Sequence, residues 1–222
     1  TSVIPDMDPT RPGSADPRKL HEAIKRFGVT QLFGSPALMR ALADHGQPLP
    51  NVRLVTSAGA PVPPEVVAKI RALLPADAQF WTPYGATECL PVAAIEGRGL
   101  EATRAATEAG AGTCVGQVVA PNEVRIIEID DAAIADWSGV HVLPVGQVGE
   151  ITVAGPTTTD SYFNRDAATR SAKIRERRSD GSERIVHRMG DVGYFDAHGC
   201  LWFCGRKTHR VETPSGPLYT EQ

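Results

Sequence analysis

The sequence contains few cysteines, and their spacing gives them no structural role. Four cysteines in 222 residues are too few for a disulfide-stabilised scaffold. Cys200 and Cys204 lie close together, but no second pair with metal-ligand spacing follows, and the histidines are scattered. Both observations argue against a structural zinc site and favour free thiols. Free thiols without an export signal predict a cytoplasmic protein.

The sequence also lacks a basic excess and long hydrophobic runs. A net charge of −3 argues against a nucleic-acid-binding surface, which usually shows clustered Lys and Arg. The densest basic run, residues 173–184, is diluted by acidic neighbours, so we predict a solvated loop there. No run is long and apolar enough to span a bilayer. A composition with 41% hydrophobic and 22% charged residues is instead typical of a globular protein.

Helix and strand signals alternate through the first half of the chain. Asp16 and Pro17 form an N-cap and first-turn pair, and Gly28 is a stop signal, so a helix is predicted between them. The expected helices are at 17–27, 36–44 and 63–74, and the expected strands are at 29–33, 52–56, 79–82 and 92–97. This alternation predicts an α/β fold with a parallel sheet, whose ligands bind beyond the carboxyl ends of the strands.

The pattern changes in the second half. Residues 100–113 are rich in Ala, Gly and Thr and predict an amphipathic turn and a loop. Four short strands punctuated by glycine then predict a small, twisted, barrel-like β-rich unit, at 123–129, 148–155, 184–196 and 200–205. The predicted division is a linker at 1–18, an α/β subdomain at 19–113, a β-rich subdomain at 114–205, and a hinge with the start of a further domain at 206–222.

The stretch "YGATE" (84–88), after the strand predicted at 79–82, joins four residue types suited to a nucleotide. Gly85 permits a close backbone approach, and Tyr84 offers a flat face for a base. The Thr87 hydroxyl can bond a phosphate oxygen, and Glu88 is a hard oxygen ligand suited to Mg²⁺. The alternative is a tight turn with a capping threonine and a surface glutamate.

Two further segments have residues suited to the same ligand. The loop "SAGAPVPP" (57–64) combines small residues with prolines and would make a rigid wall beside a planar base. Asp191 follows a glycine and could accept hydrogen bonds from a ribose diol, and Arg206 comes just past a later strand. Alone, each also fits an ordinary turn residue or surface charge.

These segments, with "GEITVAGPTTTDSYFNRDAAT" (149–169) and "GDVGYFDAHGCLWFCGR" (190–206), resemble in order and separation the adenylate-forming superfamily of acyl-CoA synthetases, luciferases and peptide-synthetase adenylation domains. The resemblance runs from about residue 20 to the end of the chain. It implies that a carboxylate and ATP form an acyl-adenylate and pyrophosphate, with Mg²⁺ as the metal. It also implies a role for each matching position: Gly59, Ala60 and Pro61 border the adenine, Tyr84 stacks on it, Thr87 touches phosphate, Glu88 binds Mg²⁺, Asp191 holds the ribose, and Arg206 lies nearby.

The sequence departs from the family pattern in three places. The Gly/Ser/Thr-rich phosphate loop with its lysine is absent, and so is the catalytic lysine of the small C-terminal domain. The expectation is therefore a piece of a longer enzyme, inactive alone, cut near the hinge. The family's hinge position, usually Asp or Lys, corresponds to Thr208, which Lys207 precedes, so the hinge is assigned to this pair.

The ending "GRKTHRVETPSGPLYTEQ" (205–222), together with "ATECLPVAAIEG" (86–97), is most similar to the bacterial β-lactone synthetases of long-chain olefin biosynthesis. This similarity implies a 2-alkyl-3-hydroxy fatty acid whose own hydroxyl expels AMP, without coenzyme A. Acyl walls of relatives correspond to Phe33, Gly112, Val115 and Gly116, which are also consistent with ordinary core and turn residues.

Two other functions remain open from the sequence. A long-chain acyl-CoA synthetase or acyl-AMP ligase would share all of these motifs and differ in its use of coenzyme A. A non-catalytic nucleotide-binding module would keep the fold without the chemistry. The expected partners are a small-molecule carboxylate and an enzyme assembly of the same pathway, with no nucleic acid.

Overall fold

The computed structural model describes all 222 residues, and the chain forms two units with dense internal contacts. Unit 1 comprises Thr1–Pro83 and Ile95–Arg104, and unit 2 comprises Tyr84–Ala94 and Ala105–Gln222. Strands β3 (Gln79–Ala86) and β4 (Cys89–Glu96) therefore have residues in both units. The division of the chain into four parts, with a boundary at 113–114, stays a prediction.

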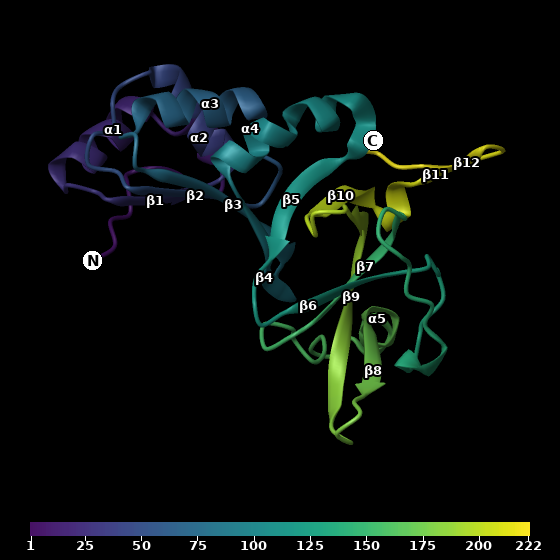
Figure 1. The fold of residues 1–222 in the computed structure, drawn as a ribbon. Coiled ribbons are helices and arrows are strands. Elements are labelled where there is room, and N and C mark those ends of the chain that lie inside the picture. Colours follow the sequence, from purple (N-terminus) through teal and green to yellow (C-terminus); the bar gives the residue numbers. More distant parts are fainter. The chain divides into compact units, whose positions relative to one another are not determined.

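Unit 1 is a parallel α/β unit (Figure 1). Strand β2 lies between β1 and β3, and both pairings are parallel. Helices α2 and α3 lie together on one face of these strands (Figure 1). The elements besides β3 are η1 (Pro12–Ser14), α1 (Pro17–Arg26), β1 (Gln31–Gly34), α2 (Pro36–His45), β2 (Leu54–Ser57), α3 (Pro64–Leu73) and α4 (Gly97–Ala106), which ends at the border of the unit.

Helix ends in unit 1 follow the signals in the sequence. Asp16 accepts a hydrogen bond from the amide of Arg18 and caps α1 as predicted, and Ser35 caps α2 by accepting one from the amide of Leu38. Gly46 ends α2 with a φ of 69°, a left-handed conformation that favours glycine. The apolar faces of the three helices meet the strands in one core built around Met39, Leu42, Val55, Ile70 and Phe80.

Unit 2 is a mixed, mainly antiparallel β unit. Its strand order is β4-β5-β10-β9-β7-β6. Strand β8 pairs with the first five residues of β9, 183–187. This order has two ends, so the strands form a twisted open sheet and do not close into a barrel. The further elements are η2 (Thr107–Ala111), β5 (Thr113–Val118), β6 (Glu123–Ile127), η3 (Trp137–Gly139), β7 (Gly149–Ala154), α5 (Asp166–Ala172), β8 (Lys173–Arg177), β9 (Glu183–Phe195), β10 (Leu201–Arg206), η4 (Lys207–His209), β11 (Val211–Thr213) and β12 (Gly216–Leu218).

Three local predictions were wrong. Strand β3 continues to Ala86, so Tyr84 and Gly85 lie in a strand and only Thr87 and Glu88 form the turn before β4. Residues 100–106 belong to helix α4, where an amphipathic turn and a loop were expected at 100–113. The basic run at 173–184 is an exposed loop only at residues 178–182, whereas Lys173–Arg177 form strand β8 and Glu183 begins β9, because Glu176 pairs with Arg125 and Arg184. No helix is both long and apolar enough to cross a membrane.

Candidate active site

Unit 2 brings Tyr84 of β3 and Asp191 of β9 into direct contact. The Tyr84 hydroxyl donates a hydrogen bond to Oδ2 of Asp191 at 2.7 Å. The Tyr84 ring centre lies 6.0 Å from that of Phe203 on β10, so the ring is packed on one side. Burial, followed by the Asp191 carboxylate, raises the pKa of Tyr84 well above its ordinary value, which keeps the hydroxyl a neutral donor.

Asp191 also pairs with a cation. It is 5% exposed, and Nη1 of Arg206, its cross-strand partner, lies 2.9 Å from Oδ1. Burial raises the pKa of Asp191, opposed by Tyr84 and Arg206. The Asp191 carboxylate is therefore held between Tyr84 and Arg206, and its contact with a ribose stays a prediction.

Glu88 is held at both its side chain and its backbone. Its Oε1 accepts a hydrogen bond from the Tyr162 hydroxyl at 2.7 Å, and its backbone oxygen accepts one from the amide of Thr159 at 2.9 Å. The Tyr162 hydrogen bond is the main cause that lowers the pKa of Glu88. Burial, assisted by Glu88, raises the pKa of Tyr162 to about 12. The result is an ionised carboxylate with one oxygen fixed, beside the exposed Thr87.

The turn that carries Glu88 is anchored by small polar side chains. The Cys89 thiol lies 3.3 Å from the Thr157 hydroxyl and 3.4 Å from that of Thr158. Thr157 in turn donates to Asn122 at 3.0 Å, and Asn122 donates to the Pro91 carbonyl at 2.7 Å. The threonine-rich segment after β7 therefore fixes the start of β4.

Two buried basic residues near this turn were missed by the sequence analysis. Lys173, 6% exposed, donates to the Thr159 carbonyl and, at 3.0 Å, to the Thr159 hydroxyl. His187 is its cross-strand partner, and burial lowers the pKa of His187 to about 4. Burial also lowers the pKa of Lys173. His187 lies in the strand predicted at 184–196, but residues 173–178 contain a single apolar side chain, Ile174, so no alternating pattern pointed to Lys173.

The predicted hinge residue Lys207 is partly buried and paired. Its ammonium lies 3.1 Å from Oε2 of Glu150 and donates to the Asp130 carbonyl at 2.9 Å. Glu150 is 1% exposed and also pairs with the buried Arg188 at 2.6 Å. Thr208 is exposed in the short helix η4. The hinge role of this pair stays a prediction.

Four of the other predicted site residues belong to unit 1. Gly59, Ala60 and Pro61 form the loop between β2 and α3 of unit 1. Phe33, 74% exposed on β1, lines a cavity of about 870 Å³ within unit 1, together with Leu38, Met39 and Leu42.

The remaining three predicted pocket residues lie in unit 2, before and on β5. Gly112 has a φ of 93°, and a Cβ there would lie 2.6 Å from the Phe203 carbonyl oxygen. Val115 packs against the core of unit 2, and Gly116 has a φ of 84°. These features agree with the packing alternative, and the role of these residues in an acyl pocket stays a prediction.

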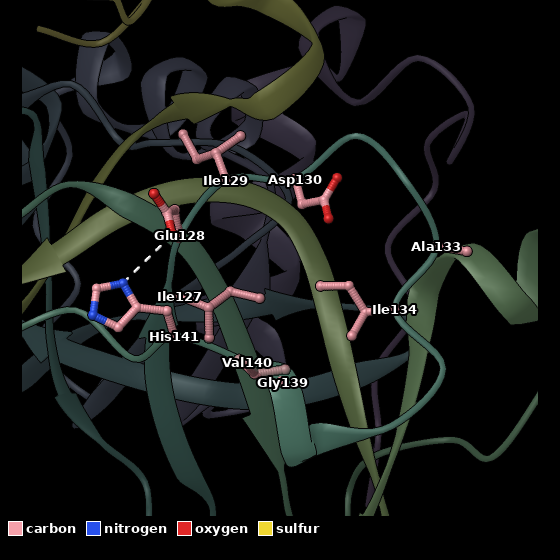
Figure 2. Close-up of a pocket in the computed structure, with 9 residues that line it drawn as sticks. All are labelled: Ile127, Glu128, Ile129, Asp130, Ala133, Ile134, Gly139, Val140 and His141. Atoms are coloured by element: carbon pink, nitrogen blue, oxygen red, sulfur yellow. Dashed lines mark ion pairs between the residues drawn. The ribbon is translucent and has the colours of Figure 1, made fainter.

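The other cavity, of about 400 Å³, lies in unit 2, and none of the predicted site residues lines it (Figure 2). Ile127, Ile134 and Val140 give it an apolar wall, and two further lining residues, Glu128 and His141, form an ion pair at 3.4 Å (Figure 2). Both members of that pair are exposed, so the cavity is a surface feature of the loop after β6.

The sequence matches a known protein family. The model of the AMP-binding enzyme family matches residues 1–163. The chain belongs to this family.

Two bacterial relatives are similar over the whole chain. It is 88% identical over 222 residues to an olefin beta-lactone synthetase of Xanthomonas campestris pv. campestris and 81% identical to one of Stenotrophomonas maltophilia. The chain spans 40% of the length of each of these proteins. It is also 30% identical, over 83% of its length and 29% of the relative's, to 4-coumarate–CoA ligase-like 4 of Oryza sativa subsp. japonica.

Solved structures share the fold. The amide bond synthetase McbA of Marinactinospora thermotolerans superimposes with a TM-score of 0.70 at 27% identity, over 93% of this chain and 38% of that one. The O-succinylbenzoate coenzyme A synthetase MenE of Bacillus subtilis, in complex with ATP and magnesium ion, gives 0.67 at 21% identity over 92% and 37%. The latter similarity concerns the fold alone.

These findings confirm the resemblance to adenylate-forming enzymes, the α/β fold class and membership in the AMP-binding enzyme family. The roles assigned to individual residues, Tyr84, Glu88 and Asp191 included, stay predictions.

Proposed function

We propose that this chain is part of an enzyme that activates a long-chain carboxylic acid with ATP as an acyl-adenylate, and that the acid is a 2-alkyl-3-hydroxy fatty acid which closes to a β-lactone. The observation that carries the proposal is 88% identity over the whole chain to an olefin beta-lactone synthetase. The conjunction of Tyr84, Glu88, Asp191 and Arg206 in one unit supports it.

In the first step, a carboxylate oxygen of the substrate attacks the α-phosphorus of ATP, and pyrophosphate leaves. Asp191 and Arg206 hold the ribose side of the nucleotide, and Tyr84, fixed by its hydrogen bond to Asp191, presents its ring to the base. Thr87 contacts phosphate. Glu88 would hold Mg²⁺, which supplies charge neutralisation at the phosphates.

In the second step, the 3-hydroxyl oxygen of the same substrate attacks the activated carbonyl carbon. The C–O bond of the lactone forms, the bond to AMP breaks, and the hydroxyl proton is lost to solvent or a base. Ring closure is intramolecular, so a cleft that fixes the near-attack geometry can offset the strain of the four-membered ring.

A second function has a specific observation in its favour. The plant relative at 30% identity is named as a coenzyme A ligase-like protein, and such an enzyme would release its adenylate to a thiol. Lactone closure needs no thiol, so coenzyme A dependence separates the two functions.

The decisive experiment uses a protein of the relatives' length that contains this chain. It is incubated with ATP, Mg²⁺ and a synthetic 2-alkyl-3-hydroxy fatty acid without coenzyme A, and the products are identified by proton NMR. We expect β-lactone protons and one AMP per lactone. The matched 2-alkyl acid without the hydroxyl should give no lactone, and Asp191→Asn should reduce lactone formation about 10-fold or more, because a hydrogen bond to a charged group is lost. A thioester formed only after coenzyme A is added would identify an acyl-CoA ligase instead.

The location and the assembly belong to the same proposal. All four cysteines are free, which supports a reducing compartment such as the cytoplasm. A product with two long alkyl chains is poorly soluble, which supports its transfer within an assembly of enzymes of the same pathway. Affinity purification at native expression levels, followed by mass spectrometry, tests the assembly.

A further inference from the structure

The Glu88 carboxylate has a partner that comes from a distant part of the sequence. Tyr162 lies in the segment between β7 and α5, and its hydroxyl donates to Oε1 of Glu88 at 2.7 Å. The same segment reaches the Glu88 backbone, where the Thr159 amide donates to the carbonyl oxygen at 2.9 Å. Glu88 is therefore held at two points by residues more than 70 positions later in the chain.

The segment that carries Tyr162 is itself fixed. The Tyr162 amide donates to the Thr169 hydroxyl of α5 at 3.0 Å. The buried Lys173 ammonium donates to both oxygens of Thr159 and lies 5.8 Å from the Tyr162 ring centre. Because α5 and β8 supply these contacts, the tyrosine hydroxyl is presented from a rigid frame.

The hydrogen bond determines which carboxylate oxygen a cation can reach. It uses Oε1, so the second oxygen stays available, and the side-chain torsions of Glu88 are restricted before any ligand arrives. Ligating carboxylates are commonly hydrogen-bonded by such partners, whose loss costs 10–100-fold in metal affinity.

We propose that Tyr162 is the positioning residue of Glu88 and that its hydroxyl orients the carboxylate for a divalent cation bound with ATP. This inference rests on the proposed function, because it takes Glu88 as the metal ligand. In this proposal Tyr162 acts through Glu88 and is not itself a ligand of the cation.

The test is Tyr162→Phe in a protein of the relatives' length that contains this chain. Mn²⁺ binding in the presence of a non-hydrolysable ATP analogue is measured by electron paramagnetic resonance. We expect the Kd of Mn²⁺ to rise about 10-fold. In ATP–pyrophosphate exchange, the KM for Mg²⁺ should rise by a similar factor while kcat at saturating Mg²⁺ changes less than about 3-fold, because excess metal restores the bound carboxylate geometry.

Tyr194→Phe is the matched control. Its hydroxyl donates to the Ala111 carbonyl at 3.1 Å, in the same unit and without contact to Glu88. Its ring lies parallel to that of Trp202 at 6.1 Å, and phenylalanine keeps this packing. The Kd of Mn²⁺ should stay within about 2-fold of the wild-type value, since neither Glu88 nor its partners change.

A double-mutant cycle with Glu88→Ala separates positioning from general stabilisation. If Tyr162 acts through Glu88, then Tyr162→Phe has no further effect on Mn²⁺ binding once Glu88 is alanine. An equal effect in both backgrounds, a wild-type Kd for Tyr162→Phe, or the same loss in Tyr194→Phe would overturn the inference. Failure of the wild-type protein to activate any acid with ATP would instead overturn the proposed function.

Discussion

At the scale of single residues, Tyr84 and Asp191 are joined by a contact that their sequence motifs do not reveal. The residue types were identified from their motifs, 107 positions apart, each with a separate expected task. The hydrogen bond between them makes the orientation of the Tyr84 ring depend on Asp191. Sequence reasoning could name both residues because each motif is local, but it could not pair them because the pairing is created by strands β3 and β9.

His187 is the residue whose protonation should affect stability most clearly. Its ring is buried, Nδ1–H donates to the Ala172 carbonyl at 3.2 Å, and Lys173 is its cross-strand partner. Its pKa is lowered from 6.5 to about 4, mainly by burial and secondly by the charge of Lys173.

The unfolded chain therefore binds the His187 proton at a higher pH than the folded protein does. As the pH falls from 6.5 to about 4, protonation of His187 in the unfolded chain lowers the free energy of unfolding, by about 3 kcal/mol at most. Urea unfolding at several pH values should show this slope in the wild type and its loss in His187→Gln. His198→Gln, at an exposed histidine, should keep the slope. An unchanged slope in His187→Gln would show that other groups cause the acid sensitivity.

At the scale of elements, local capping signals located the ends of helices α1 and α2. Caps at Asp16 and Ser35 and the stop at Gly46 each depend on neighbouring residues, so the sequence carries them directly. The solvated loop predicted at 173–184 is present only at residues 178–182, and strand β8 before it was missed for the opposite reason. Strand β8 depends on charge pairs with residues far away in the chain, which no local pattern contains.

Glu176 is the centre of that charge network. Its two oxygens accept hydrogen bonds from both Nη atoms of Arg125 at 2.5 and 2.7 Å, and Nε of Arg184 donates to it at 2.6 Å. The Arg125 hydrogen bonds are the main cause that lowers the pKa of Glu176 to about 2. The Arg125 guanidinium also lies 3.7 Å from the Trp137 ring centre, so tryptophan fluorescence can report on this element.

Glu176→Gln should lower the free energy of unfolding by about 2–3 kcal/mol at neutral pH, because two half-buried arginines lose their shared counter-charge. Urea denaturation followed by fluorescence measures the change. The control is Asp131→Asn, which removes an exposed partner of Arg210 and should change the free energy of unfolding much less, because solvent screens an exposed ion pair. Equal losses in both variants would show that burial of the Glu176 network adds nothing.

At the scale of the whole molecule, the two units share the predicted site residues unequally. Tyr84, Thr87, Glu88, Asp191 and Arg206 belong to unit 2, whereas Gly59, Ala60 and Pro61 belong to unit 1. The family resemblance found both groups because their motifs are short and ordered along the chain. It could not find Tyr162 or Lys173, since their connection to Glu88 arises only from the packing of α5 and β8 beside the turn.

A polypeptide of residues 1–222 alone is expected to form no acyl-adenylate. It spans 40% of the length of its bacterial relatives, and its sequence contains no Gly/Ser/Thr-rich lysine loop for the phosphates. Asp191, Tyr84 and Glu88 could still contact a nucleotide, but the charge that develops on the leaving pyrophosphate would lack its cationic donors. ATP–pyrophosphate exchange with a 2-alkyl-3-hydroxy fatty acid should therefore remain at background for this polypeptide and be restored in a protein of the relatives' length. Circular dichroism on the same sample provides the control for folding.

Exchange above background by the folded polypeptide would mean that residues 1–222 supply the phosphate donors themselves. The prediction that this polypeptide alone forms no acyl-adenylate would then be wrong.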